Sequence, residues 1–130
     1  MTSPLHDRHI LVVEDEYAVA ASLVAALEVF GSAVVGPVPS VEKALEAIET
    51  EPLIDAAIVD VNLRGVMAHA VAERLLARNI PFVFTSGYGH DGLRERYPKI
   101  RNCQKPYAFG EIEQALASAM REAARHVKSA

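Results

Sequence analysis

The sequence predicts an α/β fold with a five-stranded parallel sheet. Short apolar runs alternate along the chain with longer segments in which apolar residues recur at helical spacing, a pattern typical of βα units. The apolar runs are continuous, as expected for strands that are buried on both faces. Proline, glycine and serine fall at the joints between these segments. We expect five strands and five helices, with helices on both faces of the sheet because βα crossovers are right-handed.

The first half of the chain is expected to hold two strand–helix units. A strand over His9–Glu14 precedes a helix over Glu16–Phe30, and Gly31 is well placed to end that helix. The second strand covers Ala33–Gly36 and is broken by the prolines that follow. Ser40 then has the character of an N-cap for a second helix with a spaced apolar face.

The second half continues the same alternation and uses up the chain. A turn-rich stretch of glycines separates the fourth strand from a short helical segment. No linker interrupts the pattern, so we expect one domain over residues 1–130 with a core of about 8–127. The remaining expected elements are a strand over Leu53–Asp60, a helix over about Met67–Arg78, a strand over Phe82–Ser86, a short helix over Leu93–Tyr97, a weak strand over Ile100–Gln104 and a helix from Phe109 to about His126.

Composition excludes several function classes. The 130 residues are 51% hydrophobic and 23% charged, with a net charge of −4 and no concentrated basic stripe, so a nucleic-acid binder is not expected. Cys103 is the single cysteine, which rules out an internal disulfide and fits a reducing compartment. The sequence shows neither a secretory signal nor an apolar run of the roughly 18 residues that a membrane span needs. We expect a cytoplasmic protein without membrane contact.

Polar residues that can bind ligands or take part in a reaction stand at the ends of four expected strands. They are Glu14 and Asp15, Asp60, Ser86 and Lys105. Ligands of open α/β sheets bind outside the carboxyl ends of strands, so these side chains are expected to converge. Any one acid could simply cap the next helix, and a lone Lys-Pro is more often a surface turn. Crowded carboxylates, however, repel one another unless a hard cation such as Mg²⁺ is bound, and together the group indicates a cation-assisted phosphoryl-acceptor site.

These stretches resemble the receiver domain of bacterial response regulators over nearly the whole chain. The family's fold is a five-stranded parallel sheet in the order 2-1-3-4-5 flanked by five helices, a flavodoxin-like arrangement. The resemblance also implies a magnesium-dependent phosphoprotein of two-component signalling. The matching motifs are Leu-Val-Val-Glu14-Asp15-Glu16, Val-Asp60-Val-Asn62-Leu, Phe-Thr-Ser86-Gly87-Tyr88 and Lys105-Pro106-Tyr107.

By this resemblance, Asp60 is the residue that accepts the phosphoryl group. Asp15 would bind Mg²⁺ directly and Glu14 through water, with Asp60 itself as a further ligand. The backbone carbonyl of Asn62 would complete the metal site. No organic cofactor is expected.

The resemblance also assigns the groups that would respond to phosphorylation. Ser86 is expected to be the switch hydroxyl, because it lies five residues after Pro81 and directly before a small residue, whereas Thr85 would point to the opposite side of the strand. Lys105 would pair with the phosphoryl oxygens, and Pro106 would fix the backbone behind it.

The chain departs from the family pattern at one position of the switch. Many receivers carry an aromatic residue three positions before the lysine of the fifth strand, and here that residue is Asn102. Tyr88 or Tyr107 is a possible substitute, and Tyr88 is also a candidate cover for the phosphoryl site that would slow hydrolysis. The run from Phe84 resembles a subgroup of short alphaproteobacterial-type receivers with a Phe-Ala-Thr-Gly-like strand end.

The expected function is that of a phospho-acceptor rather than an enzyme, although it would assist its own phosphorylation and dephosphorylation. The implied partners are a sensor histidine kinase or histidine phosphotransferase and a downstream protein target, with the chain a monomer or weak homodimer. Two alternatives stay open. One is an interaction module that keeps the fold without phosphorylation, and the other is a flavodoxin-like cofactor binder, although the loop after the first strand lacks the Gly/Ser/Thr-rich cradle that a flavin phosphate needs.

Overall fold

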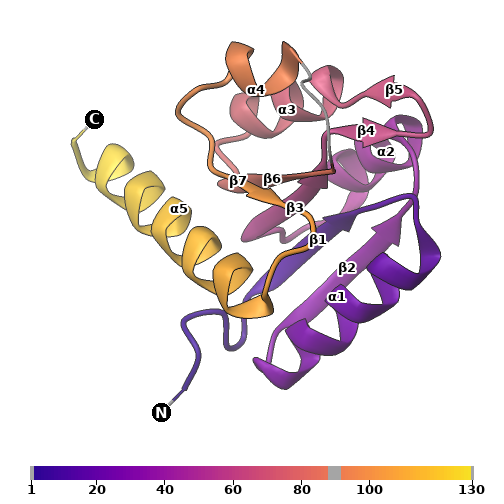
Figure 1. The fold of residues 1–130 in the computed structure, drawn as a ribbon. Coiled ribbons are helices and arrows are strands. Elements are labelled where there is room, and N and C mark those ends of the chain that lie inside the picture. Colours follow the sequence, from indigo (N-terminus) through magenta and orange to yellow (C-terminus); the bar gives the residue numbers. More distant parts are fainter. Residues whose placement is uncertain (1, 88–91, 130) are drawn as a thin grey trace.

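A central sheet of five parallel strands organises the protein (Figure 1). The computed structural model describes residues 2–87 and 92–129. Within these residues the strand order is β2-β1-β3-β6-β7, which confirms the expected order 2-1-3-4-5 of the five main strands. The strands are β1 (His9–Val13), β2 (Ala33–Val38), β3 (Ala56–Asp60), β6 (Phe82–Ser86) and β7 (Asn102–Gln104).

Four helices of nine residues or more flank this sheet in the described part of the chain, where five helices were expected. The short helix expected over Leu93–Tyr97 corresponds to the five-residue segment α4, which begins one residue earlier. Gly31 ends the first helix with φ +84°, and the Ser40 hydroxyl caps the second by accepting from the backbone N–H of Lys43. No helix of the described residues is both long and apolar enough to cross a membrane. The helices are α1 (Tyr17–Val29), α2 (Val41–Thr50), α3 (His69–Ala77), α4 (Gly92–Arg96) and α5 (Phe109–Ser129).

Alternate residues of the central strands enter two separate cores, because successive side chains of a strand point to opposite faces. Leu11 and Phe84 lie in the core that α2 and α3 cover, whereas Ile10 and Val83 lie in the core that α1 and α5 cover. All four side chains are fully buried. The continuous apolar runs of the sequence therefore correspond to strands buried on both faces, as expected.

Four strand boundaries differ from the sequence-based expectation: β1 ends one residue earlier, at Val13, β7 begins two residues later, at Asn102, and β2 and β3 differ by two and three residues. β2 continues through Pro37 to Val38, because β2 is an edge strand and a missing N–H is tolerated there. The pairing with β1 shifts register at this point, and Gly36 takes φ +91°. β3 begins three residues later than expected, at Ala56, because Asp55 binds His9 instead: its N–H donates to the His9 carbonyl and its carboxylate accepts the His9 N–H, both at 2.7 Å.

A small antiparallel hairpin follows β3 and was not predicted. β4 (Asn62–Leu63) pairs with β5 (Val66–Met67), and the expected third helix therefore begins at His69 rather than near Met67. The two turn residues, Arg64 and Gly65, both have positive φ, 55° and 85°. This is the conformation of a type I′ turn, for which Asn-Gly or Asp-Gly is the usual sequence signal.

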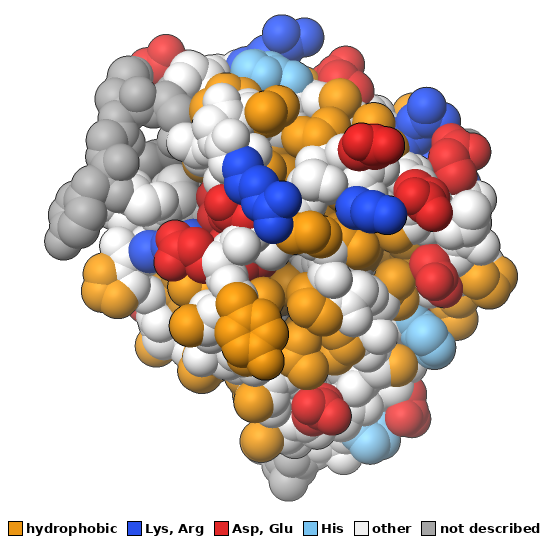
Figure 2. Space-filling view, turned by 90° about the vertical axis from the view of Figure 1, so that its right-hand side faces the viewer, with side chains coloured by type: hydrophobic (Ala, Val, Ile, Leu, Met, Phe, Trp, Pro, Cys, Tyr) orange, Lys and Arg blue, Asp and Glu red, His pale blue; other side chains and the backbone are white. Residues whose placement is uncertain are grey.

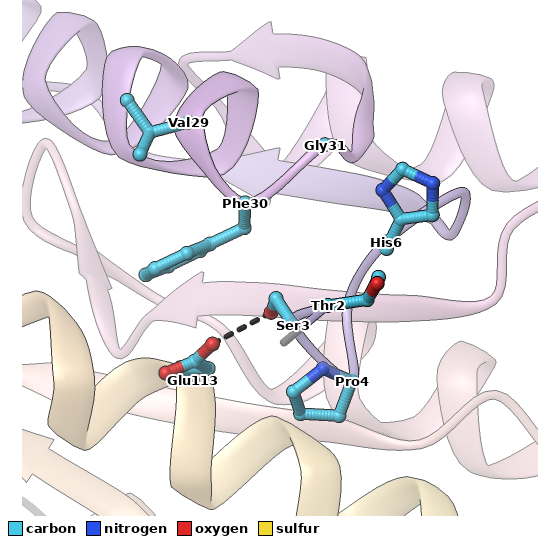
Figure 3. A pocket seen from close by; sticks show the side chains of 8 residues that line it. All are labelled: Thr2, Ser3, Pro4, His6, Val29, Phe30, Gly31 and Glu113. Carbon is cyan, nitrogen blue, oxygen red and sulfur yellow. Dashed lines mark hydrogen bonds between the residues drawn. The ribbon is translucent and has the colours of Figure 1, made fainter.

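The residues before β1 are also part of the core, although the expected core began near residue 8. Leu5 is fully buried between α1 and α5, and its carbonyl accepts a hydrogen bond from Ser32 Oγ at 2.7 Å. Ser3 Oγ donates to Glu113 on α5 at 2.6 Å, as Figure 3 shows. The cavity in that view, of about 590 Å³, lies beside this segment and is lined by none of the polar residues at the strand ends.

Candidate functional site

Asp60 is the last residue of β3 and its side chain is buried, with 7% of the side chain exposed. Both carboxylate oxygens accept hydrogen bonds: Oδ1 from the Asn62 backbone N–H at 3.0 Å, and Oδ2 from Lys105 Nζ at 2.8 Å. The parallel sheet places this residue directly beside Thr85 on β6. The carboxylate is therefore fixed in orientation at the carboxyl edge of the sheet.

Glu14 and Asp15 follow β1, the strand beside β3, and bring two more carboxylates to the same edge. The Glu14 side chain is 1% exposed; its Oε2 accepts from the Glu16 N–H at 3.1 Å, and its Oε1 lies 3.0 Å from Lys105 Nζ. Asp15 is half-buried, and its Oδ2 accepts from the Arg64 N–H at 3.2 Å. Glu14, Asp15 and Asp60 each offer one oxygen, and these oxygens all lie within 4.8 Å of one another.

Lys105 supplies the positive charge that faces two of these carboxylates. It follows β7, and its backbone N–H donates to the Ser86 carbonyl at 2.7 Å, which ties the residue to the end of β6. Burial of the ammonium lowers its pKa, but the contacts with Asp60 and Glu14 outweigh burial and raise it above its ordinary value. Lys105 is therefore charged at neutral pH. Pro106 follows through a cis peptide bond and is exposed.

Burial dominates the electrostatics of Glu14. It raises the pKa of this carboxyl to about 7, and the negative charge of Asp60 also raises it, while the Glu16 N–H and Lys105 act in the opposite direction. A carboxylate that is costly to ionise and lies near two others is suited to a cation, which would stabilise the ionised form. Hard oxygen ligands crowded in this way are the donor set that Mg²⁺ prefers, so the residues present fit this metal.

Ser86 brings a hydroxyl to the same edge, at the end of β6. Its side chain is buried, with 1% of the residue exposed, and its Oγ has no hydrogen-bond partner among the described residues. Thr85, the alternative hydroxyl, is equally buried. A buried hydroxyl without a hydrogen-bond partner is unfavourable by about 1 to 3 kcal/mol. The Ser86 hydroxyl is therefore available to donate a hydrogen bond to a ligand at this edge.

The structure brings together all six acceptor, metal and switch residues expected from the sequence. The side chains of Glu14, Asp15, Asp60 and Lys105 lie close to one another, whereas Asn62 and Ser86 are joined to Asp60 and Lys105 through backbone hydrogen bonds. Asn62 is exposed, and its backbone N–H binds Asp60; its role as a carbonyl ligand stays a prediction. Tyr88 lies outside the described residues.

Asn102 occupies the position at which many receivers carry an aromatic residue. It lies on β7 beside Phe84 and is half-buried. Its Oδ1 is buried and has no hydrogen-bond partner among the described residues.

Sequence reasoning missed one contributor to the site. The β4–β5 hairpin reaches Asp15 through the Arg64 N–H, and Asn62 Oδ1 supports the turn by accepting from Gly65 N–H at 2.8 Å. The Arg-Gly pair was the available signal, but it is a weak one without an Asn or Asp before the glycine. The edge as a whole shows acidic and basic side chains side by side with hydrophobic side chains next to them (Figure 2).

Comparison with known proteins gives matches by structure. None of the protein-family models matches the chain, and no curated protein matches it either. The solution structure of SdrG from Sphingomonas melonis Fr1 is similar with a TM-score of 0.73 and 41% identity, over 94% of this chain and 98% of that one. The BeF3-activated conformation of SdrG, attributed to Pseudomonas melonis Fr1, matches with the same identity and TM-score over 92% of this chain and 99% of that one.

A response regulator receiver protein from Sinorhizobium medicae WSM419 matches with a TM-score of 0.78 over 92% of this chain and 98% of that one. At 23% identity, this likeness supports the fold alone. The likeness to SdrG is of a different order, since it combines 41% identity with nearly complete coverage of both chains.

Proposed function

The chain belongs to the response-regulator receiver family, and from this premise we propose that it is a phospho-acceptor that takes a phosphoryl group onto Asp60. The observation that carries the proposal is the environment of Asp60: a buried carboxylate held by Lys105 Nζ at 2.8 Å, with oxygens of two further carboxylates within 4.8 Å. A buried cluster of this kind is unfavourable for folding alone. Its arrangement suits a reaction in which negative charge arrives at the strand ends.

The transfer requires one bond to form and one to break. A carboxylate oxygen of Asp60 attacks phosphorus in line, the phosphorus–nitrogen bond of a donor phosphohistidine breaks, and the electron pair of that bond stays on the imidazole nitrogen. The product is an acyl phosphate on Asp60. Lys105 remains charged throughout and neutralises the equatorial oxygens, as its raised pKa favours.

Glu14, Asp15 and Asp60 would hold Mg²⁺, with the Asn62 carbonyl as a further expected ligand. When bound, the metal supplies charge neutralisation at the phosphoryl oxygens. The three carboxylates are crowded and the Glu14 side chain is only 1% exposed, so the cation would offset their mutual repulsion. The β4–β5 hairpin orients Asp15 for this purpose through the Arg64 N–H.

The response to phosphorylation is proposed to begin at Ser86. A phosphoryl group adds a charge of about −1.5 to −2 and three strong acceptors, and the Ser86 hydroxyl has no competing partner among the described residues. Movement of this hydroxyl toward the phosphoryl group would repack the end of β6 and bias a surface that a downstream protein reads. The phosphoryl donor would be a histidine kinase or histidine phosphotransferase.

Intact mass spectrometry tests the proposal. The protein is incubated with Mg²⁺ and a small acyl phosphate, and the Asp60→Asn variant is treated identically. We expect a phosphoryl adduct on the wild type that is absent from the variant, while Asp55→Asn, a carboxylate at the other end of β3, keeps the adduct. An adduct that persists in Asp60→Asn, or none on the wild type with either the small donor or a cognate kinase, would contradict the proposal and favour a phosphorylation-independent interaction module.

A further inference from the structure

Tyr107 places a buried hydroxyl beside the acceptor site that the proposed function does not use. The residue lies two positions after Lys105, and its hydroxyl oxygen is buried with no hydrogen-bond partner among the described residues. The ring packs against the α1/α5 core and meets the ring of Phe109 edge to face at 6.3 Å. It lines a groove of about 430 Å³ that Lys105 and the first turns of α1 also line.

The Tyr107 hydroxyl can act only as a hydrogen-bond donor or neutral acceptor at neutral pH. Burial raises its pKa to about 12, and the negative charge of Glu14 adds to this, while Lys105 acts in the opposite direction. A protonated phenol without a partner in an apolar groove is unfavourable. An available acceptor near Lys105 would therefore be a favourable partner.

Glu14 offers such an acceptor. Its Oε2 accepts from the Glu16 N–H, whereas its Oε1 has no hydrogen bond from any described residue and is held by the ion pair with Lys105 Nζ at 3.0 Å. The same ammonium donates to Asp60. One lysine thus serves two buried carboxylates in the resting state.

Phosphorylation of Asp60 would change this sharing. A phosphoryl group carries more negative charge than a carboxylate, so Lys105 would be drawn toward it and away from Glu14. Glu14 Oε1 would then be a buried acceptor that has lost the ammonium, since Glu14 is expected to bind Mg²⁺ through water and not directly. Tyr107 lines the same groove as Lys105, and its hydroxyl, like that of Ser86, is a buried donor without a partner among the described residues. Ser86 has the phosphoryl group as its proposed acceptor, which leaves the Tyr107 hydroxyl for Glu14.

We propose that Tyr107 is a positioning residue of the phosphorylated state, whose hydroxyl donates a hydrogen bond to Glu14 Oε1 when Lys105 turns to the phosphoryl group on Asp60. This rests on the proposed phospho-acceptor function. The contact would report the state of Asp60 to the segment between β7 and α5, on the side where Asn102 cannot act as an aromatic switch.

The test compares Tyr107→Phe with the wild type in two states. The matched control is Tyr17→Phe, which removes the hydroxyl of a tyrosine that is 88% exposed. Thermal unfolding is measured on the metal-free proteins, and the affinity for Mg²⁺ with beryllofluoride, a phosphoryl analogue, is measured by calorimetry. We expect Tyr107→Phe to unfold at an equal or higher temperature than the wild type without metal, because it deletes an unpartnered polar atom.

In the beryllofluoride state, we expect Tyr107→Phe to bind about tenfold more weakly than the wild type, the effect of one hydrogen bond to a charged group. Tyr17→Phe should bind as the wild type does. A Tyr107→Phe affinity within about twofold of the wild type would overturn the inference, whatever the unfolding temperature does. Failure of the wild type itself to bind beryllofluoride would instead overturn the proposed function, and this inference with it.

Discussion

The buried polar groups at the amino end of the sheet have different surroundings from those at the carboxyl end. Next to the strand starts, Ser32 donates to the Leu5 carbonyl and Asp55 accepts the His9 N–H. His9 Nδ1 and Asn102 Oδ1 are buried there without a hydrogen-bond partner among the described residues. At the strand ends, Ser86 and the Tyr107 hydroxyl have no partner among the described residues, and one lysine faces two buried carboxylates. Both ends therefore keep polar atoms without hydrogen-bond partners among the described residues. At the carboxyl end these atoms lie beside a cluster of buried charges, and a metal or phosphoryl group would satisfy them.

Lys105→Met should have the largest effect on stability and phosphoryl uptake at the carboxyl end of the sheet. It removes the ammonium that contacts Glu14 and Asp60, and leaving buried charges uncompensated costs about 3 kcal/mol of the free energy of unfolding. Chemical denaturation at pH 8 without metal measures this, and Mg²⁺ should restore part of the loss. Phosphoryl uptake should fall strongly. Lys99→Met, at an exposed position before β7, is the control, and equal effects of the two variants would contradict the interpretation.

Leu5→Ala should break the amino end without touching the chemistry. Leu5 is fully buried, so its truncation should lower the free energy of unfolding by about 3 kcal/mol in denaturant titrations. Phosphoryl uptake per folded molecule should equal that of the wild type. Leu53→Ala, which truncates a side chain that is 49% exposed, should cost less than about 1 kcal/mol. A loss of uptake in folded Leu5→Ala would show that the two ends are coupled.

The pH dependence of stability should also distinguish the two ends. The pKa of Glu14 rises from 4.5 to about 7 on folding, so between these values the folded state binds more protons than the unfolded state. Its contribution is therefore full below about pH 4.5 and is lost as the pH rises through 7. For the metal-free protein the loss is roughly 2 to 3 kcal/mol.

Denaturant titrations of the metal-free protein at pH 5 and pH 8 measure this loss. Glu14→Gln should be less sensitive to pH over this range, because the amide does not ionise. Saturating Mg²⁺ should reduce the dependence in the wild type, since the cation favours the ionised carboxylate. A wild-type profile as flat as that of Glu14→Gln would contradict the raised pKa.

The smallest effect is expected at the hairpin that supports Asp15. Arg64→Asn should raise the free energy of unfolding by about 0.5 to 1 kcal/mol, because Asn tolerates the φ of +55° at this position better than Arg does. The backbone N–H that binds Asp15 is retained, so Mg²⁺ affinity should change by less than about threefold.

Arg64→Pro is the opposing variant, because proline removes the N–H and cannot adopt this φ. It should lower both stability and Mg²⁺ affinity, measured by denaturation and calorimetry. If Arg64→Asn weakens Mg²⁺ binding as much as Arg64→Pro does, the arginine side chain rather than its backbone supports Asp15.

The main features of the fold were predictable from local patterns. Continuous apolar runs such as the one before Glu14 correspond to central strands, and the strand order follows the expected parallel arrangement. Boundaries were less accurate where tertiary context overrode a local signal. Pro37 reads as a strand break, but β2 is an edge strand that tolerates it, and Leu63 and Val66 read as a loop and the approach to a helix although they pair as a hairpin.

By itself the sequence determined which chemical groups stand at the strand ends, because strand periodicity and polar endings are local properties of the chain. Only the tertiary structure decided which of these groups contact one another. Lys105 contacts both Glu14 and Asp60, and the hairpin N–H reaches Asp15. Within the part of the chain that the structure describes, the hydroxyls of Ser86 and Tyr107 are buried without partners. All of these features depend on segments far apart in the chain. Strand pairing sets these distances, and no local pattern encodes which buried atom is left unsatisfied.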